Sequence, residues 1–408
     1  MATEAIDRLG AGREVAGVTF PAAVTTTHHE LTTADGARVQ GLLHRLPGAT
    51  GVVSLTHPRQ LLAHHPMIGH LLRMGLSVWT QDGRSPNNDL NLVHEQALLD
   101  VAAGQAFLED LGFERRLTFG HSGGGALFAF YIEQAALAPE TRIATTPAGR
   151  AVALAGARMP VPTGAIFLAP HPGQGQVLLH CIDPSVTDES DPMSVDPALD
   201  MYDEANGHGR PAAYSPAFLA SYRAAQRARI ARIDARAREL AAEASHARKR
   251  FAQTNDPRDR RASLAPRIIT TYRTDADPRY ADLTLDPNDR HAGSLFGRRP
   301  ELTNYGLVGF GRLTTPDAWL STWSANTSNA GFVRCARGIS VPTVYVELSG
   351  DAAAFPADAD AMFAAIAAPD KTRFLVRGQH FGQPLAAGEP TGYAAAAEVI
   401  GPWVEERA

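Results

Sequence analysis

The sequence predicts one α/β domain with a mostly parallel central sheet, helices on both faces and a large, mainly helical insertion. Short apolar runs alternate with amphipathic stretches, which is typical of strands linked by crossover helices. This alternation stops at residue 171 and resumes at residue 341. The composition, 44% hydrophobic and 20% charged over 408 residues, is that of a folded globular chain with a sizeable core.

The first half of the chain begins with a predicted hairpin over residues 24–46, whose turn is the dipeptide Asp35-Gly36. Strands and helices then alternate. The expected strands are 51–56, 76–80, 116–119 and 164–169, and the expected helices are 61–75, 91–112 and 126–138. Pro66 allows a later start for the first of these helices. This order predicts a parallel sheet, because strands that are joined through helices run in the same direction.

The last part of the chain returns to the same rhythm. Its expected strands are 341–348 and 373–376, and its expected helices are 356–368 and 391–406. The sequence therefore divides into residues 1–170 as the first part of the core, 171–340 as a cap or lid insertion, and 341–408 as the second part of the core. An insertion at this point is expected to cover the carboxyl ends of the strands and to enclose a substrate pocket.

The insertion contains a long amphipathic helix predicted over residues 216–251. Ser215 can cap it and Pro216 suits its first turn. Its apolar stripe is expected to lie across the body of the protein, and a homodimer through this helix is the alternative use of that stripe. Trp319 and Trp323, one helical turn apart, are expected to pack there or to line the substrate pocket.

The motif that carries chemistry is Gly120-His121-Ser122-Gly123-Gly124, which matches G-x-S-x-G. A predicted strand enters it and a predicted helix leaves it, as the tight turn of a nucleophile elbow requires. Such a turn presents the serine hydroxyl at the carboxyl end of the sheet, where open α/β folds bind ligands. Ser122 is therefore the predicted nucleophile.

A serine needs a base, and in hydrolases with this elbow an acid and then a histidine follow it along the chain. His380 is the only histidine after the strand predicted at 341–348, and glycines flank its loop. Asp351 comes just after that strand and is the predicted acid that orients His380. Glu347, closer to the strand interior, is the second choice for the acid.

The oxyanion hole needs two N–H donors. Gly123, the residue after the nucleophile, is one predicted donor. The other should follow strand 51–56; Pro58 has no N–H, so Arg59 is the expected donor, with Gln60 second. The remaining pocket residues are expected to be His57, which shapes this loop, and His121, next to the nucleophile.

On these residues the chain resembles serine hydrolases of the α/β-hydrolase superfamily, including bacterial members with a large cap. The resemblance covers residues 24–170 and 341–406, and the insertion stands where that superfamily carries its cap domain. It implies catalysis by Ser122, Asp351 and His380. Two departures are the His57-Pro58-Arg59 loop, where relatives often have His-Gly, and the unusual length of the cap.

The expected activity is hydrolysis of a carboxylic ester, lactone or thioester of a medium-sized, largely hydrophobic substrate through an acyl-enzyme. A carbon–carbon bond hydrolase with the same triad is the alternative, and a non-catalytic ligand-binding protein is a third hypothesis. Enzymes of this fold with an aspartate nucleophile are disfavoured because position 122 is serine. Fold alone does not choose among these activities.

The remaining expectations are negative. A net charge of −5 disfavours a nucleic-acid partner. Cys181 and Cys335 form no zinc or disulfide framework, and no metal or cofactor is expected. The sequence shows neither a signal peptide nor a membrane span, so a cytoplasmic location is expected.

Overall fold

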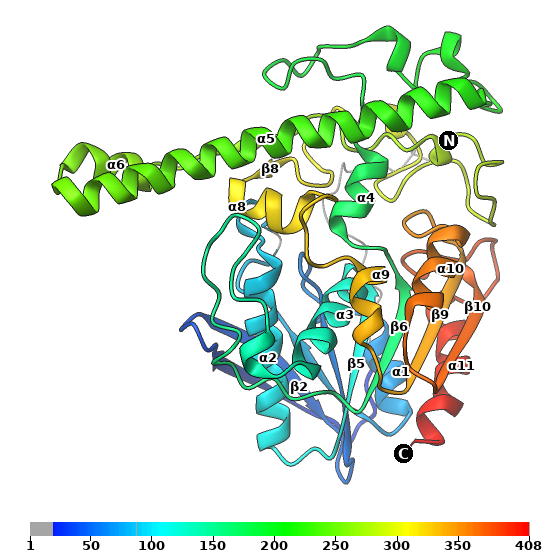
Figure 1. The fold of residues 1–408 in the computed structure, drawn as a ribbon. Coiled ribbons are helices and arrows are strands. Elements are labelled where there is room, and N and C mark those ends of the chain that lie inside the picture. The colour runs from blue at the N-terminus through cyan, green and yellow to red at the C-terminus, as the bar shows by residue number, and fades with distance from the viewer. Residues whose placement is uncertain (1–18, 87, 408) are drawn as a thin grey trace.

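The computed structural model describes residues 19–86 and 88–407. Its centre is an eight-stranded sheet in the order β1-β2-β4-β3-β5-β6-β9-β10 (Figure 1). β2 is antiparallel to both β1 and β4, and every other neighbouring pair is parallel. The strands are β1 Thr25–Thr32, β2 Arg38–Arg45, β3 Gly51–Thr56, β4 Ser77–Gln81, β5 Arg115–Ser122, β6 Gly164–Pro170, β9 Thr343–Gly350 and β10 Lys371–Gln379.

Helices cover both faces of the sheet. α2, α3, α9 and α10 share one apolar core with Phe167 and Tyr345, whereas α1 and α11 share the opposite core with Ile166 and Val344. These strand residues alternate between the two faces because successive side chains of a strand point in opposite directions. The helices are α1 Met67–Arg73, α2 His94–Asp110, α3 Gly123–Ala136, α9 Phe332–Cys335, α10 Pro356–Ala365 and α11 Gly392–Glu405.

The predicted α/β class and the mostly parallel sheet are confirmed. Most boundaries differ from the sequence prediction by a few residues, and two of the differences have a clear consequence or cause. α1 starts at Met67, the later start that Pro66 allowed, because Pro66 occupies its N-cap and proline suits only a helix start. β5 runs on to Ser122, so the nucleophile of the predicted elbow is the last residue of its strand.

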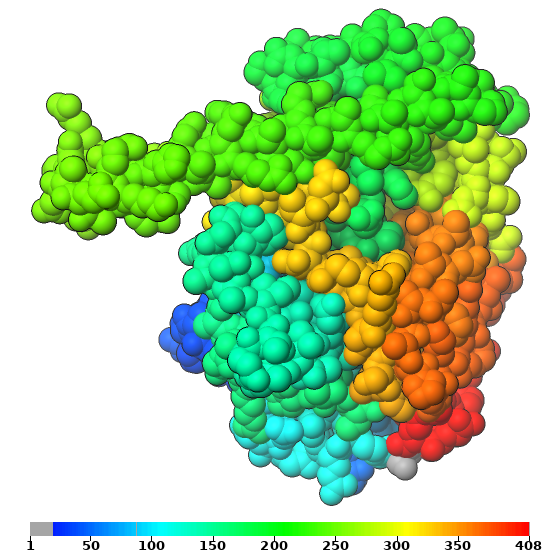
Figure 2. All heavy atoms as spheres, in the orientation of Figure 1, coloured from blue at the N-terminus to red at the C-terminus, as the bar shows by residue number. Residues whose placement is uncertain are grey.

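The segment between β6 and β9 lies above the sheet in Figure 1. Its dominant element is α5, 39 residues long, with Ser215 capping it by accepting a hydrogen bond from the Phe218 N–H at 3.1 Å. The far end of α5 extends beyond the body, where α6 folds back on it (Figures 1 and 2). The elements of this segment are α4 Gln174–Cys181, α5 Pro216–Thr254, α6 Pro257–Leu264, β7 Ile269–Thr270, α7 Pro300–Thr303, β8 Leu313–Thr314 and α8 Pro316–Ala318.

Trp319 and Trp323 lie in a π-helical turn directly after α8, and both are fully buried. They share an apolar cluster with Ile230 and Ile233 of α5. The indole Nε1 of Trp319 also donates a hydrogen bond to the Asp234 carboxylate at 2.8 Å. The two tryptophans therefore fix the middle of α5 to the segment beneath it.

The homodimer through residues 216–251, the alternative use of this helix, stays a prediction. If the exposed end of α5 pairs with a second copy, light scattering should give twice the mass of one chain. Pairing is expected because the end of α5 that extends beyond the body buries little of its surface unless a second copy covers it. A monomer mass over the full range of usable concentrations would contradict the dimer.

A buried ionic cluster holds the loop after β7 against α5. Asp277, 1% exposed, accepts hydrogen bonds from the guanidinium groups of Arg223 and Arg279, each with a nitrogen at 2.7 Å. Burial alone would raise the pKa of this carboxyl, but the two arginines outweigh it and hold the pKa of Asp277 well below its ordinary value. The charged form of Asp277 therefore stabilises the fold.

Asp277→Asn is expected to lower the free energy of unfolding by about 3 kcal/mol at neutral pH. The buried Arg279 would lose its closest carboxylate and keep only the carboxylates of Asp358 and Asp286, at 3.3 and 3.6 Å. Since the folded pKa is depressed, the difference from wild type should shrink as the pH falls below about 4. Urea denaturation at several pH values measures this. Asp370→Asn, which breaks a half-exposed pair with Arg407, is the control and should change little. Equal effects of the two substitutions would contradict this account.

Among the described residues, no helix combines the length and the apolar character needed to cross a membrane.

Candidate active site

Ser122 sits at a sharp turn where β5 ends and α3 begins at Gly123. Its backbone has φ 56° and ψ −125°, a conformation that non-glycine residues rarely adopt. The turn requires small neighbours: a Cβ on Gly120 would lie 2.7 Å from the Gly125 Cα, and one on Gly124 would lie 2.7 Å from the Thr56 carbonyl oxygen. These glycines let the chain hold the buried Ser122 in a strained backbone conformation.

The structure brings the three predicted triad residues together from three strand ends. The Ser122 hydroxyl lies 2.9 Å from His380 Nε2, and His380 Nδ1 lies 2.9 Å from both carboxylate oxygens of Asp351. Asp351 is further held by the N–H groups of Ala353 and Ala354, at 2.6 and 3.1 Å. His380 thus has its Nδ1 proton fixed on a carboxylate and its Nε2 lone pair directed at the serine.

Glu347, the second choice for the acid, lies elsewhere. It stands inside β9, paired in register with Leu375 of β10, and its carboxylate accepts a hydrogen bond from Arg373. The carboxylate in contact with His380 is that of Asp351, which follows the end of β9.

His121 faces the back of His380. Its Nε2 donates to the His380 carbonyl oxygen at 2.9 Å, and its Nδ1 lies 3.3 Å from Nε2 of His65, whose Nδ1 accepts the Met67 N–H. Burial, followed by the neighbouring imidazoles of His65 and His380, holds the pKa of His121 well below its ordinary value. The expected pocket residue His121 is therefore a neutral support of the His380 main chain.

The loop after β3 differs from the expected oxyanion geometry. The N–H groups of Arg59 and Gln60 both donate to Nδ1 of His57 at 3.0 Å. The Arg59 guanidinium makes two hydrogen bonds to Asp89, at 2.6 and 2.7 Å, and lies 5.0 Å from the centre of the Trp323 ring. The prediction that Arg59 gives the second oxyanion donor thus needs correction, because His57 engages its N–H.

Three side chains surround Gly123: the expected pocket residue His57, and Gln174 and His171, which the sequence analysis did not single out. A Cβ added to Gly123 would lie 2.3 Å from Gln174 Nε2 and 3.0 Å from Nε2 of both His171 and His57. His171 follows β6, and Gln174 is the first residue of α4. The only sequence signal for them is the polar, glycine-rich run His171–Gln176 just after a buried strand, where parallel sheets place functional groups.

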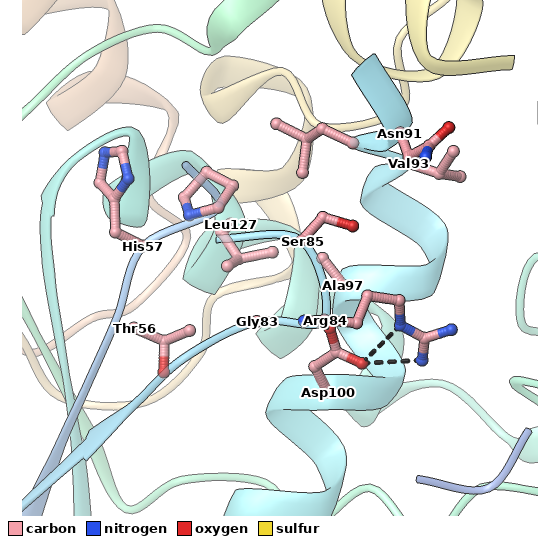
Figure 3. A pocket seen from close by; sticks show the side chains of 12 residues that line it. Thr56, His57, Gly83, Arg84, Ser85, Asn91, Val93, Ala97, Asp100 and Leu127 are labelled. Atoms are coloured by element: carbon pink, nitrogen blue, oxygen red, sulfur yellow. Dashed lines mark hydrogen bonds and ion pairs between the residues drawn. The ribbon is translucent and has the colours of Figure 1, made fainter. Parts of the chain in front are cut away.

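Two cavities lie near the carboxyl ends of the strands, and one of them borders the triad residue Asp351. One, about 10 Å³ and close to the least that a water molecule needs, lies beside His57 and Thr56 at the end of β3 (Figure 3). The other, about 270 Å³, lies beside Asp351 between Leu348 of β9 and Leu375 of β10. Neither of these two cavities is lined by Ser122, Trp319 or Trp323, so the expected role of the tryptophans as pocket walls stays a prediction.

Within residues 19–86 and 88–407, no three His, Cys, Asp or Glu side chains are grouped in a way that would hold a metal ion. The histidines near Ser122 instead bond to main-chain groups, to one another or to Asp351. The chemistry that this arrangement offers is proton transfer at a serine hydroxyl.

No protein-family model and no curated protein sequence matches the chain. Solved structures with similar folds include the complex of DcsB with its substrate analogue, at 12% identity and a TM-score of 0.48, covering 94% of this chain and 100% of that one. Hypothetical protein PA2218 from Pseudomonas aeruginosa has 11% identity and a TM-score of 0.47, over 97% and 98% of the two chains. The monoacylglycerol lipase of Paleococcus ferrophilus has 14% identity and a TM-score of 0.41, over 94% and 100%.

Likenesses this distant carry no argument about activity. The fold itself follows from the strand order, the single antiparallel edge formed by β1 and β2, and the sharp turn between β5 and α3. With Asp351 after β9 and His380 after β10, this chain has the α/β-hydrolase fold.

Proposed function

We propose that this protein is a serine hydrolase that cleaves a carboxylic ester, lactone or thioester of a medium-sized, largely hydrophobic substrate. The observation that carries the proposal is the hydrogen-bonded series of Ser122, His380 and Asp351, with both contacts of the imidazole at 2.9 Å. An idle serine in a glycine-rich turn requires no such partners. A nucleophile does, because a hydroxyl attacks a carbonyl only when a base removes its proton.

In the acylation step the Ser122 oxygen attacks the carbonyl carbon while its proton passes to His380 Nε2. Asp351 holds the Nδ1 proton and stabilises the imidazolium that forms. The tetrahedral intermediate then collapses, the carbon–oxygen bond to the leaving alcohol breaks, and His380 returns the proton to that alcohol. A thioester reacts in the same way and releases a thiol.

In the deacylation step a water molecule takes the place of the alcohol. His380 removes one proton from the water, the resulting hydroxide attacks the acyl carbon, and the bond to Ser122 breaks. The proton returns to the serine oxygen, and the acid leaves. Each turnover therefore consumes one substrate and one water and needs no cofactor.

The size of the substrate is proposed from the segment 171–340, which we treat as a cap over Ser122. Its centre is apolar, with α5, Trp319 and Trp323 in one cluster. Binding sites of this kind combine apolar walls with a few convergent polar groups, and Gln174, His171 and His57 supply polar groups next to Gly123. An enclosed site fits a small molecule better than a polymer.

A carbon–carbon bond hydrolase acting on a diketone is the alternative, since the same triad serves both reactions. A non-catalytic ligand-binding protein is the third hypothesis. The short contacts of His380 to two partners favour an enzyme over this third hypothesis, because a binding protein has no use for an oriented base.

A substrate panel separates these functions. Wild-type protein is assayed with p-nitrophenyl esters of short, medium and long acyl chains, with lactones and with a diketone. The proposal expects the highest kcat/KM for a medium-chain ester. Turnover confined to the diketone would support the alternative, and binding without turnover of any compound would support the third hypothesis.

A further inference from the structure

The histidines next to Gly123 have their tautomers fixed by the main chain. His171 Nδ1 accepts the Gly173 N–H at 3.0 Å, and His57 Nδ1 accepts two N–H groups, so in both rings the proton resides on Nε2. Burial, followed by the charge of His380, lowers the pKa of His171 to about 3, so this ring is neutral at physiological pH. Both Nε2–H groups lie 3.0 Å from the Cβ position of Gly123.

Gln174 adds an amide at the same place. It is 1% exposed, and neither its Nε2 nor its Oε1 makes a hydrogen bond within the described part of the chain. His94 lies close to it, fully buried, and neither of its ring nitrogens makes a hydrogen bond of normal geometry with that amide. A buried amide is rarely left unsatisfied without a functional reason.

The position of this amide is held by the backbone. Gly173, which precedes α4, has φ +116°, and a Cβ there would lie 2.6 Å from the Ala330 carbonyl oxygen. The chain can therefore make this turn only with glycine, and the turn directs Gln174 Nε2 to the space that a side chain at position 123 would fill. That space borders the Gly123 N–H, which belongs to the first turn of α3, where N–H groups have no partner within the helix.

We propose that Gln174 Nε2 is the second donor of the oxyanion hole, beside the Gly123 N–H, with the Nε2–H of His171 supporting it. This rests on the proposed serine-hydrolase function. The N–H of Arg59, expected in that role, donates to His57 instead. Such a hole, with one backbone and one side-chain donor, holds the negative oxygen of the tetrahedral intermediate with neutral groups that are already in place before the substrate binds.

The test replaces the Gln174 amide with an apolar group of similar length. Gln174→Met should lower kcat for p-nitrophenyl butyrate by about 100-fold and leave KM within about twofold, because the lost bond forms only in the transition state. The inhibition constant of phenylboronic acid, which forms a tetrahedral adduct with serine, should rise by the same factor as kcat/KM falls. The melting temperature should change little, since the amide makes no hydrogen bond of normal geometry within the described residues.

Gln176→Met is the matched control. Gln176 lies on the same helix, is half-buried, and its Nε2 donates to the Ala325 carbonyl at 3.3 Å, so its loss should leave kcat unchanged. Gln174→Glu, which keeps the side-chain length but offers a carboxylate, replaces the Met variant if that one fails to fold, and the same loss is expected.

The outcomes are distinct. A folded Gln174 variant with wild-type kcat, or one in which only KM rises, overturns the oxyanion assignment while leaving the serine-hydrolase function intact. A wild-type protein that neither hydrolyses esters nor reacts with a fluorophosphonate at Ser122 overturns the function and the assignment together.

Discussion

Ser122→Ala is expected to lower kcat by about 10⁵-fold on any ester that the wild type hydrolyses. The alanine removes the only atom that attacks the carbonyl, while the strained turn, the glycines and the helix behind it remain. His380 would then have no hydroxyl at 2.9 Å from which to take a proton. Single-turnover and steady-state kinetics with p-nitrophenyl esters measure the loss, and circular dichroism checks that the fold is unchanged.

The matched control for this substitution is Ser349→Ala. Ser349 also lies near the carboxyl end of a strand, in β9, is 9% exposed, and its hydroxyl has no hydrogen-bond partner among the described residues. The Ser349→Ala variant should keep the wild-type activity, because Ser349 touches none of the reacting atoms in the proposed mechanism. If Ser122→Ala retained more than about a tenth of the wild-type kcat, the assignment of the nucleophile would be wrong, since triad serines contribute far more.

Asp351→Asn is expected to lower kcat/KM by about 10⁴-fold, as loss of a triad carboxylate does. The asparagine amide would donate to His380 Nδ1 and drive the ring proton to Nε2. The imidazole would then present a proton, instead of a lone pair, to the Ser122 hydroxyl, and so lose its function as a base. Steady-state kinetics over a range of pH measure the effect.

Glu347→Gln provides the comparison, because Glu347 pairs with Arg373 inside the sheet and makes no contact with His380. Its kcat/KM should remain near the wild-type value. The opposite pattern, with an active Asp351 variant and an inactive Glu347 variant, would transfer the acid role to Glu347 and contradict the geometry of this site.

The fold was predictable from local patterns. Each strand is a short apolar run between turn residues, and the elbow is a strand, a glycine-rich turn and a helix within a few residues of one another. Ser122, Asp351 and His380 could be named because each stands next to the end of a strand, and parallel strands bring their carboxyl ends to one edge. These three predictions need no knowledge of how distant segments pack.

The other side chains around the site depend on packing between segments. Gln174 reaches Gly123 only because Gly173 turns the chain against Ala330, which is far away in the sequence. In the same way, the Arg59 N–H is engaged because the loop after β3 folds onto its own His57 ring. His121 supports His380 through a main-chain carbonyl, and no residue pattern encodes that contact. For these residues the sequence shows which functional groups are present but not where the fold places them.

The most direct test of the central claim is the site of covalent labelling by a fluorophosphonate. The reagent phosphonylates serines that a neighbouring base activates, and mass spectrometry of the intact protein and its peptides locates the adduct. This account predicts one adduct per chain, on Ser122, formed slowly or not at all in the Asp351→Asn variant. A folded protein that stays unlabelled, or an adduct on any other residue, would contradict it.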